Sequence, residues 1–149
     1  MAATTARGRG RSRPLMKGRT AARLMQAFAN EARIAREDLV ARKAIVSLEE
    51  MTAALGVSRE ALSMLVRTNK IFSVEVGHER YYPRFFVDPT IERRKLECVS
   101  RALGDLRGWE KWRFFTTGKL SLGTLTPLAA LKRGMYREVL IAARGFAER

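Results

Sequence analysis

Cysteine and histidine are nearly absent from this 149-residue sequence, which contains one of each, Cys98 and His78. A single cysteine excludes an intramolecular disulfide, and the pair cannot supply a structural zinc cage or a Cys/His nucleophile pair with the usual spacing. The sequence also lacks a phosphate-binding glycine loop and convincing paired carboxylates. We therefore expect no enzymatic activity, no metal and no cofactor.

Long apolar runs are absent as well, because Arg or Lys interrupts each run before the roughly 18 to 20 residues that a membrane span requires. Hydrophobic residues nevertheless make up 46% of the chain, which is enough to bury a core. The length fits one domain of ordinary size, or two very small domains that share a core. We expect a folded protein that does not cross a membrane.

Acidic residues are scarce. The chain has 29 Lys and Arg residues against 15 Asp and Glu residues, so the formal net charge is +14. Arg outnumbers Lys by 22 to 7, and guanidinium groups are well shaped for phosphates and guanine edges. The excess favours nucleic acid or another polyanion as a partner, with a merely basic surface as the alternative.

Residues 1–20 carry six basic side chains, three glycines and no acid. This composition predicts a disordered basic arm. An organellar transit peptide is the less favoured alternative, because the Arg-Gly alternation and Pro14 interrupt the amphipathic helix that it needs. Such an arm either lies along DNA phosphates or in a minor groove, or is a solvated tail without a specific role.

Residues 21–46 have helical periodicity and predict an amphipathic helix. Its apolar stripe is alanine-rich and therefore shallow, with successive spacings of four, four, three and four residues: Leu24, Phe28, Ala32, Ala35 and Leu39. The stripe packs either on the chain's own domain or on the same helix of a second chain. Both alternatives stay open at this point.

Residues 47–88 contain the clearest local pattern. Ser47 and Glu50 form a capping box that begins a helix, and Gly56 ends it. Ser58 can cap a second helix, from residue 59 to about residue 68. Two short helices joined by a glycine-containing turn are typical of a helix-turn-helix.

A two-stranded wing is predicted directly after these helices. Apolar residues alternate over 72–76, Gly77-His78 can form a turn, and Arg80-Tyr81-Tyr82 returns before Pro83. His78 is interpreted as a turn residue rather than a catalyst. Together the segments predict a winged helix-turn-helix that binds double-stranded DNA, and the alternative is an ordinary helical hairpin with a solvated outer face.

The candidate DNA-binding side chains lie on the outward positions of the second helix, just beyond it and on the hairpin. The N-terminal end of such a helix reaches base edges, so Arg59, Glu60 and Ser63 are the expected readers, whereas Arg67 and Lys70 suit phosphates. The full predicted set is Ser58, Arg59, Glu60, Ser63, Arg67, Lys70 and Arg80.

Residues 89–149 predict a small helical domain. An apolar stripe from Ile91 to Leu106 marks a helix that ends near Gly108, with Cys98 buried in or beside the stripe. Four aromatic residues follow, and we interpret them as a packed core that leaves some rings exposed: Trp109, Trp112, Phe114 and Phe115.

Two further helices are predicted at the end of the chain. Thr126 followed by Pro127 has the pattern of an N-cap with proline at the first helical position, and Gly134 is a C-terminal stop. The last helix runs from about 136 to 146. The two helices are expected to form a compact hairpin.

Residues 112–143 resemble the toxin-binding domain of the Xre/MbcA/ParS antitoxins, which has a Trp followed by Leu-Gly-x-x-Thr-Pro-x-x-x-Leu-x-x-Gly. Trp112, Leu122-Gly123, Thr126-Pro127, Leu131 and Gly134 fit this pattern. The sequence departs from it at 114–117, where Phe-Phe-Thr-Thr replaces a short polar segment. The long Arg/Gly arm is not a hallmark of the family.

The resemblance implies a type II antitoxin that inhibits a cognate toxin, commonly a RES-domain enzyme that consumes NAD, and represses its own operon. It further implies a bacterial cytoplasmic protein, nucleoid-associated when bound to DNA; a homodimer is expected because two half-sites are usually read. The toxin-binding candidates, which could instead close the domain's own core, are Trp112, Phe115, Leu122, Thr126, Pro127, Tyr136, Phe146 and Arg149. The alternative function is a stand-alone winged-helix transcriptional regulator of a phage or mobile element.

Overall fold

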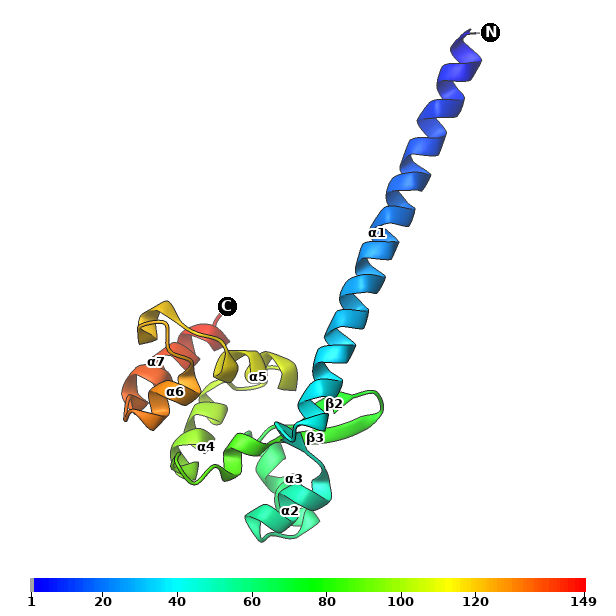
Figure 1. Cartoon of the computed structure of the whole chain (residues 1–149). Helices are drawn as coiled ribbons and strands as arrows, with labels where there is room; N and C mark the ends of the chain where they lie inside the picture. The colour runs from blue at the N-terminus through cyan, green and yellow to red at the C-terminus, as the bar shows by residue number, and fades with distance from the viewer. Residues whose placement is uncertain (1) are drawn as a thin grey trace. The chain divides into compact units, whose positions relative to one another are not determined.

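A computed structural model describes the backbone of residues 2–149 and the side chains from Gly18 onward. Over these residues the chain is mainly helical, with seven α-helices and a small three-stranded sheet (Figure 1). It divides into two compact units, one that ends at Asp38 and one that spans Leu39–Arg149.

The first unit consists of most of α1, which runs over Ala2–Ala41 (Figure 1). The structure therefore differs from the disordered arm predicted for residues 1–20, whose backbone is helical from Ala2 onward. An α-helix closes its backbone hydrogen bonds internally, so a basic segment without an apolar stripe can adopt it. The amphipathic helix predicted to reach residue 46 ends five residues earlier, at Ala41.

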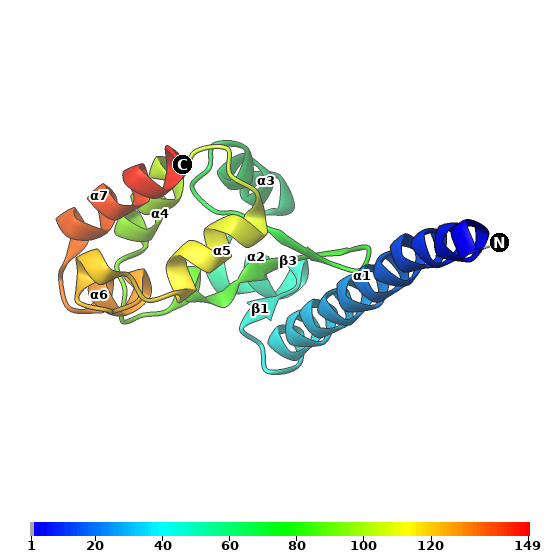
Figure 2. The same cartoon turned by 90° about the horizontal axis from the view of Figure 1, so that it is seen from above.

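The second unit contains, just after the end of α1, a strand that sequence periodicity does not predict. β1 (Ile45–Val46) pairs antiparallel with β3 (Glu79–Pro83), which in turn pairs with β2 (Val74–Val76), so the strand order is β1-β3-β2 (Figure 2). In the register of the sheet, Val46 lies opposite Tyr82. The predicted hairpin of β2 and β3 is present, and Gly77 at its turn adopts a φ of 64°.

The two predicted short helices are also present as α2 (Leu48–Leu55) and α3 (Arg59–Arg67). Ser47 Oγ accepts a hydrogen bond from the Glu50 amide at 3.2 Å, which confirms the predicted cap. Ser58 Oγ accepts one from the Ala61 amide at 3.1 Å in the same way. Gly56 ends α2 in the left-handed conformation that glycine adopts without steric cost.

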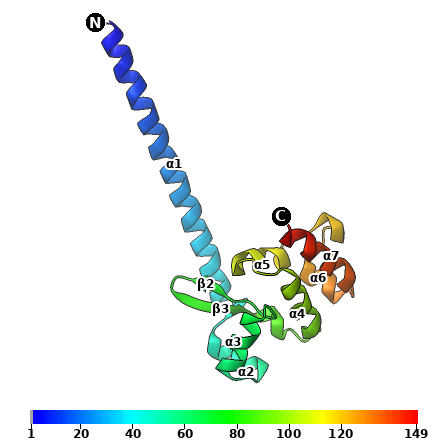
Figure 3. The same cartoon turned by 180° about the vertical axis from the view of Figure 1, so that it is seen from behind.

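The C-terminal half of this unit follows a short 3-10 turn, η1 (Arg84–Val87). Four helices and one further 3-10 turn make up this half, and α4, α6 and α7 lie close together (Figure 3). Their bounds are α4 (Arg93–Ala102), α5 (Gly108–Thr116), η2 (Leu120–Leu122), α6 (Pro127–Lys132) and α7 (Tyr136–Ala147).

Three details of this half test the sequence predictions. Thr126 Oγ1 accepts a hydrogen bond from the Ala129 amide at 3.1 Å, and Gly134 has a φ of 80°, so the predicted cap and stop are confirmed. The helix expected to end near Gly108 is shorter, because α4 ends at Ala102. Cys98 is exposed rather than buried, because the buried stripe of α4 runs through Leu96 and Val99, on either side of it.

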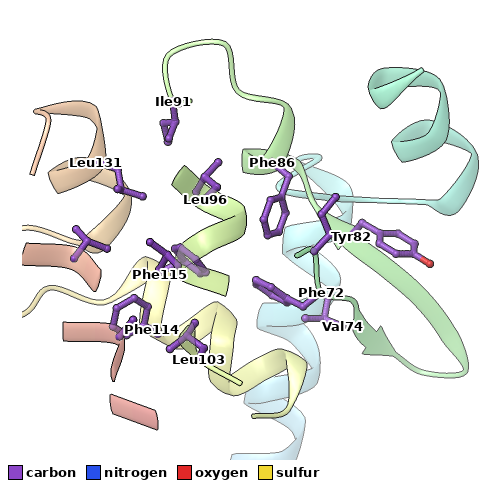
Figure 4. Packing of buried hydrophobic residues seen from close by; sticks show 14 of the residues in the cluster. Phe72, Val74, Tyr82, Phe86, Ile91, Leu96, Leu103, Phe114, Phe115 and Leu131 are labelled. Carbon is purple, nitrogen blue, oxygen red and sulfur yellow. The ribbon is translucent and has the colours of Figure 1, made fainter. Parts of the chain in front are cut away.

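A single hydrophobic core spans both halves of the second unit, and aromatic rings join them (Figure 4). Phe72, which precedes β2, stacks on Phe115 of α5 with ring centroids 6.0 Å apart. Phe85 of η1 stacks on Trp112 of α5 at 5.7 Å. The segments predicted as separate domains, 47–88 and 89–149, therefore share one core.

Candidate nucleic-acid interface

A surface groove of about 640 Å³ lies between the N-terminal turns of α2 and α3 and the β2–β3 hairpin. It brings three of the predicted DNA-binding residues together, Arg59 and Ser63 from α3 and Arg80 from β3. The remaining lining residues come from the start of α2 and from the hairpin: Ser47, Leu48, Glu49, His78, Glu79, Tyr81 and Tyr82. We call this feature the α3–hairpin groove.

Arg59 is held at the rim of the α3–hairpin groove by an ion pair. Its Nη2 lies 2.9 Å from Glu49 Oε1, and both side chains are largely exposed. An ion pair in this setting contributes little to stability, because water screens it and two long side chains must be ordered. The guanidinium can therefore exchange Glu49 for a phosphate or a base edge at small cost.

The other predicted DNA-binding residues on and beside α3 lie in three settings. Glu60, Ser63 and Arg67 are exposed, as the prediction requires. The hydroxyl of Ser58 accepts the hydrogen bond that caps α3, so its role in the structure is to begin the helix. Lys70 is half-buried just beyond the helix.

The hairpin contributes polar and aromatic groups to the groove. Tyr81 Oη donates a hydrogen bond to Glu79 Oε2 at 2.8 Å. This bond, burial and the charge of Glu79 raise the pKa of Tyr81, so the phenol stays protonated. Tyr81 and His78 also line the groove, but they were not among the predicted DNA-binding residues. The aromatic and basic residues of the hairpin sequence were the signal that could have identified them.

A polar cluster that includes one buried lysine supports the end of α3 from the C-terminal half. Lys111 of α5 is only 2% exposed, and its Nζ lies 3.4 Å from Asn69 Oδ1. Asn69 Nδ2 donates to Asp105 Oδ1 at 3.3 Å. Burial lowers the pKa of Lys111, and the charge of Asp105 opposes this effect. Sequence periodicity gives no sign of this cluster, because a lysine on an aromatic helix is ordinarily placed at the surface.

Most of the predicted toxin-binding residues have structural roles. Phe115, Leu122 and Pro127 are buried in the core, so they are not available to a partner in this conformation. Thr126 caps α6, and Trp112 packs on Phe85. For these five residues the structure favours the alternative that they close the domain's own core. Tyr136, Phe146 and Arg149 remain partly or fully at the surface.

A second groove, of about 450 Å³, lies between α7 and the segment around η2. Ile141 and Phe146 line it, and Ile141 is 68% exposed. Lys119 Nζ lies 4.7 Å from the centroid of the Phe146 ring, and Arg113 Cζ lies 5.7 Å from it. Burial, Arg113 and Arg149 lower the pKa of Lys119. We call this feature the α7 groove.

Sites of other kinds are not found in the part of the chain that the structure describes. Within these residues, no group of three or more His, Cys, Asp or Glu side chains is placed to hold a metal ion. None of the helices described there combines the length and the apolar character that crossing a membrane demands.

Comparisons with known proteins give one structural likeness. No family model matches the chain, and no curated protein matches it. The chain is similar to a structure described as the NMR structure of Rv2175c, with a TM-score of 0.57 and 22% sequence identity. The similarity covers 69% of this chain and 80% of that chain, and at this identity it concerns the fold alone.

Proposed function

We propose that the protein binds double-stranded DNA through α3 and the β2–β3 hairpin, as a winged helix-turn-helix. The observation that carries the proposal is the α3–hairpin groove, in which the exposed first turn of a capped helix faces a hairpin that bears Arg80. The net charge of +14 supplies the general attraction to a polyanion.

In this proposal, the first turns of α3 enter the major groove. Arg59 and Ser63 are then close to base edges, and a guanidinium reads a guanine through two parallel hydrogen bonds. Arg67 lies on the later turn of the exposed face, where it suits a phosphate. Arg80 on β3 reaches the backbone beside the α3 contact, as a wing does.

The test compares two single-charge variants on a duplex selected from a random pool. Arg59→Ala is expected to weaken binding to the selected duplex by about 1 to 3 kcal/mol and to weaken random DNA much less. The matched control is Arg137→Ala, which removes an exposed cation from α7. Equal loss on selected and random DNA, or equal loss in both variants, would contradict the assignment of Arg59 as a base reader.

A second candidate function is inhibition of a protein partner, as in a type II antitoxin. The α7 groove favours it, because exposed Ile141 lies beside a half-buried aromatic ring and several cations, and apolar anchors with a polar rim are typical of protein interfaces. A partner that offers an apolar anchor flanked by carboxylates would suit this surface. The family resemblance of residues 112–143 is the separate reason to expect a toxin.

This candidate is tested by co-purification after nuclease treatment, followed by reconstitution with the recovered protein. Ile141→Asp is expected to abolish a stoichiometric complex and to leave DNA binding unchanged, whereas Arg101→Glu on α4 should leave both unchanged. A complex that survives Ile141→Asp would place the interface elsewhere. Recovery of the protein alone would favour the stand-alone regulator.

A further inference from the structure

The exposed part of α1 has an apolar side that its own unit leaves uncovered. From Gly18 to Ala35 every residue of the helix is exposed. Four of these residues are large and apolar, and the first three gather toward one side of the helix: Leu24, Met25, Phe28 and Ile34. An apolar patch of this kind on a helix is normally covered by a partner.

The spacing of this apolar side is that of a coiled coil. Ala21, Met25, Phe28, Ala32 and Ala35 follow one another at intervals of four, three, four and three residues. These intervals place them at alternating d and a positions of a heptad repeat, which form a narrow seam along one side of a helix. Leu24 lies at the edge of the seam, at a g position. The alanines permit a close approach of two helices.

The b and f positions of the same helix carry polar side chains, and four of these are paired within the helix, whereas exposed Ile34 lies at a c position. Gln26 Nε2 donates to Asn30 Oδ1 at 3.3 Å, and Arg33 Nη1 lies 3.1 Å from Glu37 Oε1. In the same register all four residues occupy b and f positions, the ones that face away from a coiled-coil partner. The local ion pair and hydrogen bond thus identify the solvent side independently of the apolar spacing.

We propose that residues 21–36 of α1 pair in parallel with the same residues of a second copy of this chain. Charge complementarity identifies the partner and its direction. Glu31 occupies a g position and Arg36 the e position of the next heptad, and in a parallel pair these positions face each other across the seam. In an antiparallel pair g positions face g positions, so Glu31 would face Leu24, Glu31 or Asp38 of the partner helix and would lose the complementary arginine.

The pairing has a consequence for DNA recognition that rests on the proposed function. Because the Leu39–Arg149 unit begins at the C-terminal end of α1, parallel helices bring both of these units to the same end of the pair. Two α3 helices at one end can read two half-sites. The pairing itself does not depend on DNA binding, since it is measured without DNA.

The first experiment is sedimentation equilibrium of the nuclease-treated full chain over a range of concentrations, with two variants. Phe28→Glu places a charge in the seam, whereas Ile34→Glu places the same charge at a c position; the two native side chains are 64% and 59% exposed. The expected result is an association constant at least about tenfold weaker for Phe28→Glu, or about 1.4 kcal/mol, and unchanged for Ile34→Glu. A wild-type monomer at all concentrations, or equal effects of both variants, would overturn the proposal.

The second experiment tests the direction of the pair by disulfide formation in a Cys98→Ser background. Ala32→Cys at a seam position is expected to give an oxidised dimer, whereas Ala27→Cys at a c position is not. In a parallel pair the two copies of position 32 face each other. Equal cross-linking at both positions, or none at position 32, would overturn the parallel pairing.

The third experiment uses charge reversal to test the ion pair between copies. Glu31→Arg is expected to weaken association, and adding Arg36→Glu is expected to restore it, because the reversed pair is again complementary. Failure of the double variant to recover would overturn the proposed g–e contact. DNA binding that stays unchanged in the variants of α3, while association behaves as expected, would contradict only the DNA-binding proposal.

Discussion

The two halves of the Leu39–Arg149 unit differ in what they place at the surface and what they bury. Residues 39–88 expose the polar face of α3 and the hairpin, and turn Phe72, Phe85 and Phe86 inward. Residues 89–149 supply the rings that meet them, above all Phe115. Neither half encloses its aromatic residues alone. The DNA-binding surface that we propose on the first half therefore depends on the second half for its support.

The strongest test of this dependence is Phe115→Ala. Phe115 is fully buried and contacts three phenylalanine rings of the first half, so its removal is expected to cost about 3 to 5 kcal/mol of unfolding free energy. Urea unfolding followed by tryptophan fluorescence and by far-UV circular dichroism should give one shared transition. The control Leu120→Ala removes a side chain that is 91% exposed and is expected to change stability by less than about 0.5 kcal/mol. Separate unfolding transitions for the two halves would contradict the conclusion that the first half depends on the second for its support.

The next largest effect is expected where α5 begins against β2. A Cβ added to Gly108 would collide with the carbonyl oxygen of Ser73, and Trp109 Nε1 donates to the Glu75 carbonyl at 3.0 Å in the same place. Gly108→Ala must therefore push α5 away from the hairpin, at a cost of about 1 to 3 kcal/mol.

Gly145→Ala is the matched control for Gly108→Ala. Its added Cβ meets nothing within 4 Å, and Gly145 lies inside α7, so this variant is expected to stabilise the protein by about 0.5 to 1 kcal/mol. Thermal unfolding of the two variants should show shifts of opposite sign. A harmless Gly108→Ala would show that the hairpin does not rest closely on α5.

Local signals in the sequence predicted much of this unit, in both halves. The caps at Ser47, Ser58 and Thr126 and the stop at Gly134 were predictable, because a short polar side chain or a glycine acts on its own neighbouring backbone. These signals also located α3, and with it most of the candidate site.

Contacts between residues distant in the sequence were not predictable in this way. β1 has two residues and no periodicity of its own, and it exists because β3 offers a pairing edge. Buried Lys111 depends on Asn69 and Asp105, which lie on other segments. The sequence likewise left open whether Phe115 and Leu122 face a partner or close the domain's own core, and the structure places both in the shared core.

A smaller effect on stability is expected at Lys111. This residue tests how the two halves depend on each other, because its hydrogen bond to Asn69 joins α5 to the end of α3. Burial lowers its pKa in the folded protein, so the unfolded chain binds the proton more tightly. The free energy of unfolding therefore rises with pH between the pKa of Lys111 in the folded protein and its unfolded value near 10.5. Over this range the folded protein loses the proton first, and the cost of burying the charge disappears.

Lys111→Met should remove this pH dependence. Its urea midpoint is expected to change less between pH 7 and pH 10 than that of the wild type, while Lys132→Met, at an exposed lysine, should keep the wild-type rise. Stability profiles of Lys111→Met and wild type that run parallel over this range would show that the buried ammonium group does not carry the effect.

The smallest effect is expected at Asp88, where a polar contact crosses the junction between the halves. Its Oδ1 accepts hydrogen bonds from Thr90 Oγ1 at 2.6 Å and from the Thr90 amide at 2.9 Å, and its Oδ2 lies 3.5 Å from Lys132 Nζ. These contacts lower the pKa of Asp88, with the Thr90 hydroxyl as the largest cause. The stability that they contribute is present above the unfolded pKa near 3.8 and is lost as pH falls through the folded value.

Asp88→Asn is therefore expected to cost at most about 1 kcal/mol at pH 7, and less as the pH approaches 3. Lys132→Met in the same assay separates the contribution across the junction from the local one, because it leaves both Thr90 hydrogen bonds in place. If Lys132→Met costs as much as Asp88→Asn, the ion pair to α6 dominates. A negligible cost for Lys132→Met would mean that Asp88 mainly orders its own turn, and that the halves are joined by their aromatic rings rather than by charge.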